Sequence, residues 1–201
     1  MPYIKEVFDV VTIDHAKHVV LTSDPANPNK FQEETDFLIN KIIEESIIPE
    51  GSKVLDFGCG MGRISKELVH RLNCHVIGVD ISDSMLNFAK LYVRSLKKFE
   101  TKNSYLIPNS VDAALAILVL QHVENPEQEI ENIFSCIKPG GYFVLLNEHV
   151  RYVPSSIDKN NFIVWNDDRY DVVAKAKTLF TEIKQIDYVS SDKKIFIFQK
   201  P

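Results

Sequence analysis

The sequence contains few cysteines, and those few form no recognisable pattern. Among its 201 residues are three, Cys59, Cys74 and Cys136, an odd number that cannot pair completely. None stands in a Cys-x-x-Cys arrangement or beside histidines at metal-ligand spacing, which argues against a disulfide framework and against a structural metal site. We therefore interpret the three as reduced thiols of an intracellular protein.

Long apolar runs and an excess of positive charge are also missing. No stretch approaches the roughly 20 apolar residues that a membrane-spanning helix needs, and no charged start followed by an apolar run indicates a signal peptide. The formal net charge is -5, whereas a nucleic-acid-binding surface favours a basic face. These absences predict a cytoplasmic protein with no membrane partner, and they disfavour a nucleic-acid partner. The sequence leaves the oligomeric state open.

Helical and strand-like patterns alternate along the chain, which predicts an α/β fold. After an irregular segment, 1–31, the expected helices are 32–47, 63–72, 82–96, 125–141 and 168–178, and the expected strands are 53–57, 75–80, 99–101, 111–120 and 142–148. Ser82 and Asn125 are expected to cap their helices, with Pro126 at the first helical position. Lys138 and a left-handed Gly140 are expected to mark the end of the 125–141 helix. A polar loop is expected after residue 148. Two alternating strands, 181–189 and 193–200, then suggest an antiparallel hairpin. Strands joined by helices favour right-handed crossovers and a mostly parallel sheet with helices on both faces, within a single domain of three layers.

Glycine is scarce as well, with seven in the chain, yet three of the seven stand at alternate positions in "VLDFGCGMGRISKEL", residues 54–68. Gly58, Gly60 and Gly62 join an apolar strand directly to a helical pattern. Residues without a Cβ atom permit positive φ and let the backbone approach a ligand, and the following helix presents free N–H groups. At the carboxyl end of a parallel strand, such a turn predicts a ligand site.

Two aspartates narrow the choice of ligand. Asp56 lies just before the glycines, where a carboxylate would repel a diphosphate but suit an ammonium group, and Asp80 ends the next strand, where it can accept hydrogen bonds from ribose hydroxyls. The spacing G-x-G-x-G differs from the dinucleotide pattern, and no Gly-Lys-Ser/Thr follows as in a phosphate-binding loop. We interpret the ligand as a ribose with an ammonium-bearing tail, and a dinucleotide oxidoreductase is the disfavoured alternative.

Four ordered segments resemble the motifs of the class I S-adenosylmethionine-dependent methyltransferases of the small Rossmann-like type. They are "VLDFGCGMG", "VIGVDISDSML", "VDAALAILVLQHVENP" and "IKPGGYFVLLNE", within residues 53–148. The resemblance implies a three-layer fold with a mostly parallel seven-stranded sheet, a C-terminal antiparallel hairpin and an N-terminal cap helix. It implies one domain over 1–201, with a cap or lid in 1–50, a cofactor-binding core in 51–148, and a substrate-side loop, helix and hairpin in 149–201.

The resemblance also implies S-adenosyl-L-methionine as cofactor, S-adenosyl-L-homocysteine as product, and a set of binding residues. The set is Asp56, Phe57, Gly58, Cys59, Gly60, Gly62, Asp80, Ile81, Met85, Asn103, Ile117 and Leu118. Asp56 and the glycine backbone would face the methionine part, and Asp80 the ribose. Cys59 is interpreted as a small filler of the turn and not as a nucleophile, because its neighbours include no base to activate it. Ile81 and Met85 would flank the adenine, although Met85 is equally well explained as a core residue. Family members often bind the adenine amino group with an acidic residue after the third strand. This chain has no acidic residue there, and Asn103 is expected to make the contact instead.

The acceptor is expected to be a small molecule, with oxygen favoured over nitrogen or carbon. Related nitrogen methyltransferases of macromolecules carry an Asn/Asp-Pro-Pro-aromatic motif after the fourth strand, where this chain has "LQHV", residues 120–123. His122 or His149 could act as the general base for an oxygen acceptor, although an ordinary helix-entry histidine is the favoured explanation of His122. No metal is expected, because no acidic cluster is present. The alternative is a catalytically silent methyltransferase-like subunit that binds the cofactor or a partner protein.

Overall fold

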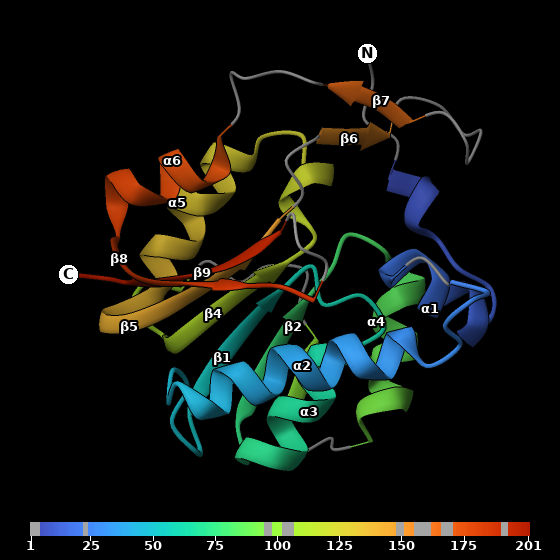
Figure 1. Ribbon diagram of the computed structural model, residues 1–201, viewed down its shortest axis with the longest axis horizontal. Helices are drawn as coiled ribbons and strands as arrows, with labels where there is room; N and C mark the ends of the chain where they lie inside the picture. The colour runs from blue at the N-terminus through green and yellow to red at the C-terminus, as the bar shows by residue number, and fades with distance from the viewer. Residues whose placement is uncertain are drawn as a thin grey trace. The chain divides into compact units, whose positions relative to one another are not determined.

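The structure is a computed structural model that describes residues 5–21, 24–94, 98–101, 107–147, 151–154, 162–165, 171–189 and 193–201. Seven strands form one sheet in the order β3-β2-β1-β4-β5-β9-β8, and β6 and β7 form a separate two-stranded sheet (Figure 1). The pairs β1–β2, β2–β3 and β4–β5 are parallel, whereas β5–β9 and β9–β8 are antiparallel. The predicted α/β fold with a mostly parallel seven-stranded sheet and an antiparallel C-terminal hairpin is confirmed. The chain divides into two compact units, Phe8–Ser104 and Tyr105–Pro201 with Met1–Val7.

The unit Phe8–Ser104 contains the glycine turn. Its elements are α1 (Ile13–Val20), α2 (Lys30–Glu44), β1 (Lys53–Phe57), α3 (Arg63–Leu72), β2 (His75–Val79), α4 (Asp83–Val93) and β3 (Phe99–Thr101). The hydroxyl of Ser82 accepts a hydrogen bond from the N–H of Met85, so the predicted N-cap of α4 is confirmed. Helix α1 packs against α4, and α2 against α3 (Figure 1).

The prediction that residues 1–31 are irregular is wrong. A 3-10 helix, η1, covers Lys5–Phe8, α1 follows it, and α2 begins at Lys30 and ends at Glu44, earlier at both ends than expected. Thr12 caps α1 by accepting from the N–H of His15. An isolated eight-residue helix is marginal in water, so packing of its apolar face must stabilise α1. The residues that provide this packing are distant in sequence, so the local sequence pattern did not predict the helix.

The unit Tyr105–Pro201 carries the C-terminal half of the sheet. Its elements after the start of the unit are β4 (Val111–Ile117), η2 (Leu120–His122), α5 (Pro126–Cys136), β5 (Ile137–Leu146), β6 (Arg151–Pro154), β7 (Phe162–Trp165), α6 (Val172–Leu179), β8 (Thr181–Asp187) and β9 (Lys194–Gln199). Asn125 caps α5 and Pro126 occupies its first turn, as predicted. Helices α5 and α6 lie side by side in this unit (Figure 1).

The main differences from the sequence prediction in this unit concern α5, β4 and the loop after residue 148. Helix α5 ends at Cys136, and Lys138 and Gly140 belong to β5. The ammonium of Lys138 pairs with Asp112 at 2.6 Å instead of meeting the end of a helix, and Gly140 adopts its expected positive φ, +77°, within the strand. Strand β4 stops at Ile117, because the backbone of the next residue turns into the left-handed region. The loop expected after residue 148 contains the β6–β7 pair.

Candidate functional site

The glycine turn between β1 and α3 has a backbone that only glycine adopts without strain. Gly58, Gly60 and Gly62 have φ values of +71°, +53° and +83°. The N–H groups of Gly58 and Cys59 both donate to the carbonyl oxygen of Val79, at 2.8 and 2.9 Å. These bonds fasten the turn to the end of β2, so the carboxyl ends of both strands open at the same place.

At two of these glycines, neighbouring side chains also leave no room for a Cβ atom. A Cβ atom on Gly60 would lie 2.6 Å from a methyl group of Val20 in α1. A Cβ atom on Gly62 would lie 2.8 Å from a methyl group of Val93 in α4 and 3.3 Å from the Cβ atom of Ala89. The turn is therefore covered by α1 on one side and held against α4 on another.

Asp80 connects the glycine turn to the start of α4. One carboxylate oxygen accepts from the N–H of Gly60 at 2.8 Å, and the other accepts from the N–H of Ser82 at 3.0 Å. Burial raises the pKa of Asp80, while these backbone hydrogen bonds act in the opposite direction. Two carboxylate oxygens offer about four lone-pair positions, so acceptor capacity remains for a ligand's hydroxyl groups.

Asp56, near the end of β1, is a buried acid with 2% of its surface exposed. The hydroxyl of Ser65 donates to its Oδ2 at 2.5 Å. Burial raises the pKa of Asp56 to about 6, against the opposing effects of the Ser65 hydrogen bond and of the Arg63 charge. The site therefore contains a carboxylate whose negative charge is poorly solvated, and a cationic ligand group would relieve that cost.

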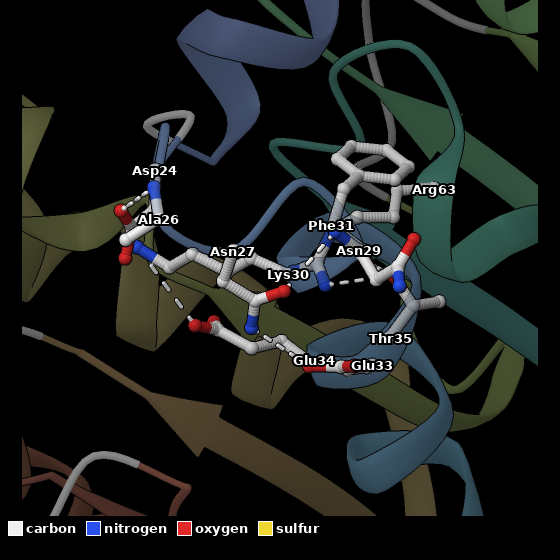
Figure 2. Close-up of polar contacts among 10 residues, drawn as sticks. All are labelled: Asp24, Ala26, Asn27, Asn29, Lys30, Phe31, Glu33, Glu34, Thr35 and Arg63. Carbon is white, nitrogen blue, oxygen red and sulfur yellow. Dashed lines mark hydrogen bonds and ion pairs between the residues drawn. The ribbon is translucent and has the colours of Figure 1, made fainter.

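Arg63 is a feature of the site that sequence reasoning missed. It is the first residue of α3 and only 3% exposed. One terminal nitrogen donates to Thr35 Oγ1 at 3.1 Å, and the guanidinium carbon lies 5.8 Å from the centroid of the Phe31 ring (Figure 2). Its Nε is buried and has no hydrogen-bond partner among the residues that the structure describes. A signal was available, because a cation in the first turn opposes the helix dipole.

The segment before α2 covers the turn with apolar side chains. Val10 and Ala16 form a buried cluster with Met61 of the turn and with Met85 of α4, which is 2% exposed. Met85 thus occupies a core position, while its neighbour Ile81 is 46% exposed. Polar contacts fix the same segment to the start of α4. The Ser82 hydroxyl donates to Asp9 at 2.8 Å, and the N–H of Val10 donates to the Ser84 hydroxyl at 2.9 Å.

The remaining turn residues, Phe57 and Cys59, are buried, with 9% and 5% of their surfaces exposed. The Cys59 thiol donates weakly to the carbonyl of Gly60 at 3.6 Å. Burial, followed by the charges of Asp56 and Asp80, raises the pKa of the Cys59 thiol well above its ordinary range. The thiol is therefore protonated near neutral pH, which agrees with its interpretation as a small filler and not a nucleophile.

The unit Tyr105–Pro201 contains the candidate site residues of the fourth-strand motif. Ile117 ends β4, and Leu118 has φ +55° and donates its N–H to the carbonyl of Leu146 at 2.7 Å. His122 ends η2 and is half-buried. Gln121, another residue that sequence reasoning missed, is 4% exposed, and its side-chain oxygen has no partner in the structure. The candidates Asn103 and His149 lie outside the described residues.

Comparison with known proteins agrees with this geometry. Residues 55–145 match the family described as "Methyltransferase domain". A ubiquinone biosynthesis O-methyltransferase of Coxiella burnetii is 30% identical over 119 residues, 55% of this chain and 50% of that protein. A sterol 24-C-methyltransferase of Aspergillus fumigatus is 34% identical over 104 residues, 48% of this chain and 28% of that protein. The chain thus spans about half the length, or less, of these curated relatives.

A solved structure shares the fold. The S-adenosylmethionine-dependent methyltransferase from Mesorhizobium loti aligns with a TM-score of 0.62 at 15% identity, covering 85% of this chain and 100% of that one. The chain is thus similar to methyltransferases over about half of its length, and it has the fold of a solved S-adenosylmethionine-dependent methyltransferase. The segment that matches the methyltransferase domain, residues 55–145, contains the glycine turn, Asp56, Asp80 and Arg63.

Two negative findings apply to the part of the chain that the structure describes. Within the described ranges, no group of three or more histidine, cysteine, aspartate or glutamate side chains is arranged to hold a metal ion. Among the helices of those ranges, none combines the length and the apolar character required to cross a bilayer.

Proposed function

We propose that the chain transfers a methyl group from S-adenosylmethionine to an oxygen atom of a small molecule. The observation that carries the proposal is the pairing of two carboxylates, the buried Asp56 and the half-buried Asp80, with a glycine turn at the carboxyl ends of adjacent strands. Anions at this position oppose a diphosphate and favour a ligand that carries positive charge. S-adenosylmethionine carries two such charges, a sulfonium and an ammonium, beside its ribose.

The residues present fit this cofactor. The positive φ values of Gly58, Gly60 and Gly62 turn the backbone sharply at the carboxyl end of β1, and the buried Nε of Arg63 has no hydrogen-bond partner among the described residues. In the proposal, Asp80 accepts hydrogen bonds from the ribose hydroxyls, and Asp56 holds the ammonium group. A further set of proposed contacts completes the site: Phe57, Gly58, Cys59, Gly60 and Gly62 along the turn, Ile81, Met85 and Asn103 at the adenine, and Ile117 and Leu118 below the cofactor.

Methyl transfer from a sulfonium requires little of the protein beyond alignment of the two reactants. The bound cofactor supplies a methyl group on a sulfonium, which departs as a neutral thioether that needs no proton. The chain's task is to hold the acceptor oxygen in line with that methyl group and to exclude water, which can account for much of the barrier. An acceptor hydroxyl also loses a proton, and in the proposal His122 or His149 receives it as general base. The oxygen preference is supported by the name of the Coxiella burnetii relative.

Titration calorimetry with S-adenosylhomocysteine and S-adenosylmethionine tests the cofactor assignment. Saturable binding of one molecule per chain is expected, and absence of binding for both would overturn the proposal. Radiolabelled methyl transfer to a panel of hydroxylated and amino acceptors then tests the reaction, with His122→Gln expected to lower the rate for hydroxyl acceptors only. Binding without transfer to any acceptor would instead favour the silent, cofactor-binding subunit.

A further inference from the structure

Gln121 has a buried side-chain oxygen that accepts no hydrogen bond from the described residues. It belongs to η2, the short helix that follows β4, and is only 4% exposed. Its Oε1 is buried and has no hydrogen-bond partner in the described part of the chain. A buried polar atom without a partner is costly, and native proteins contain few of them. The oxygen therefore requires a physical explanation that the fold alone does not supply.

The backbone around Gln121 is fixed at the carboxyl ends of two strands. Leu118, just past the end of β4, has φ +55°, a value that residues with a Cβ atom rarely adopt, and its N–H donates to the carbonyl of Leu146 at 2.7 Å. The N–H of Gln121 donates to Oδ1 of Asn147, the residue after β5, at 3.1 Å. Unusual backbone conformations that the surrounding structure holds in place are typical of binding and active sites. Gln121 thus has a fixed position at the edge of the sheet where ligands bind in parallel α/β folds.

Strand β6 of the same unit packs against η2. It covers Arg151–Pro154 and pairs with β7, Phe162–Trp165. Both strands belong to the segment after β5 in which the sequence predicts a substrate-side role. Gln121 therefore belongs to an element that contacts the segment where the methyl acceptor is expected to bind.

The chemistry of an amide oxygen restricts the groups that it can bind. Such an oxygen accepts hydrogen bonds from O–H and N–H groups, but unlike a histidine it does not take up their proton near neutral pH. A hydroxyl that reacts must lose its proton during methyl transfer, because the ether that forms carries none. In the proposed function, that proton passes to His122 or His149. The donor that Gln121 can hold throughout the reaction is therefore a second group of the acceptor, one that does not react.

We propose that Gln121 recognises a second hydroxyl or amino group of the methyl acceptor, so that the substrate carries at least two such donors. The proposal rests on the proposed methyltransferase function and adds to it a specificity-determining residue and a substrate class. By holding the second donor, Gln121 orients the reacting oxygen. An acceptor that lacks this donor leaves Oε1 unpaired in the complex, and sites built to bind a hydroxyl reject analogues without it for this reason.

Radiolabelled methyl transfer to paired acceptors tests this recognition. The pairs are the isomeric dihydroxybenzenes and the matching fluorophenols, in which fluorine replaces one hydroxyl and cannot donate a hydrogen bond. For the wild-type chain we expect kcat/KM to be ~10–100-fold higher for at least one dihydroxybenzene than for its fluorophenol, the range for leaving a buried acceptor unpaired. Gln121→Met should lose this preference by lowering kcat/KM for the dihydroxybenzene alone. Gln121→Glu, which keeps an accepting oxygen, should retain part of the preference.

The melting temperature of the ligand-free chain separates recognition from a structural role. Gln121→Met removes an unpaired buried oxygen and keeps nearly the same shape, so it should raise the melting temperature by about 2–4 °C. Gln128→Met, at an exposed position of α5, is the matched control and should change neither the melting temperature nor the preference. If Gln121 serves only the fold, Gln121→Met will not raise the melting temperature, or it will slow transfer to both members of a pair equally. Either result overturns the proposal.

The wild-type rates distinguish failure of this proposal from failure of the proposed function. Equal rates for both members of every pair, or efficient transfer to acceptors that carry a single donor, overturn the role of Gln121 and leave methyl transfer intact. Failure of the wild-type chain to methylate any hydroxylated or amino acceptor overturns the proposed function, and the role of Gln121 with it.

Discussion

Replacing Asp56 with asparagine should make the protein more stable and less able to bind its cofactor. The amide has nearly the same shape, and its oxygen can still accept from the Ser65 hydroxyl. The change therefore removes the buried charge and little else. Buried carboxylates destabilise the folded state when they ionise, because folding withdraws the anion from water.

The size of the effect follows from the pKa. Burial raises the pKa of Asp56 from its ordinary value of 3.8 to about 6. At about 1.4 kcal/mol for each pKa unit, the ionised residue reduces the free energy of unfolding by about 3 kcal/mol. Because the folded-state pKa is the higher one, the full stability is present below pH 3.8 and is lost as the pH rises through 6. Asp56→Asn should therefore gain about 3 kcal/mol at pH 8 and about half of that at pH 5.

Urea unfolding followed by circular dichroism at pH 8 and pH 5 measures both values. Asp187→Asn is the matched control, since Asp187 has an 80% exposed side chain in β8 and its replacement should change stability by less than about 0.5 kcal/mol. The same Asp56 variant should bind S-adenosylhomocysteine ~10–100-fold more weakly, because the partner of the ammonium loses its charge. A variant that is no more stable at pH 8, or whose gain is the same at both pH values, would refute the reasoning.

Three further outcomes follow from the geometry of the turn. Asp80→Ala should weaken S-adenosylhomocysteine binding by on the order of 1–3 kcal/mol in calorimetry, and unchanged affinity would contradict the ribose assignment. Gly62→Ala should lower the free energy of unfolding by about 1–3 kcal/mol, since it strains φ +83° and brings a methyl group against Val93; adding Val93→Ala should recover only the contact part, as a double-mutant cycle in urea would show. Cys59 should resist iodoacetamide in the folded protein and react only at the rate of unfolding, so rapid labelling under native conditions would disprove its burial and raised pKa.

Local chemistry explains why much of the fold could be predicted. Strand β1 and the Ser82 and Asn125 caps are confirmed, because hydrophobic runs and cap hydrogen bonds involve residues within a few positions of one another. The predicted end of α5 was wrong, because it depends on contacts that are distant in sequence. The sequence Lys138-Pro139-Gly140 has the composition of a helix stop, but pairing of β5 with β4 and β9 takes those residues into a strand.

The sequence by itself determined the glycine turn, the strand-end aspartates Asp56 and Asp80, and the family to which they point. These features depend on φ preferences and on residue order, which are local properties of the chain. Only the tertiary structure decided that Arg63 is buried with no carboxylate of the described residues in ion-pair contact, and that α1 covers the turn. Arg63 meets Thr35 from 28 residues away, and Ser82 meets Asp9 from 73. Burial and pairing at such separations arise from the packing of whole elements, which no short stretch of sequence specifies.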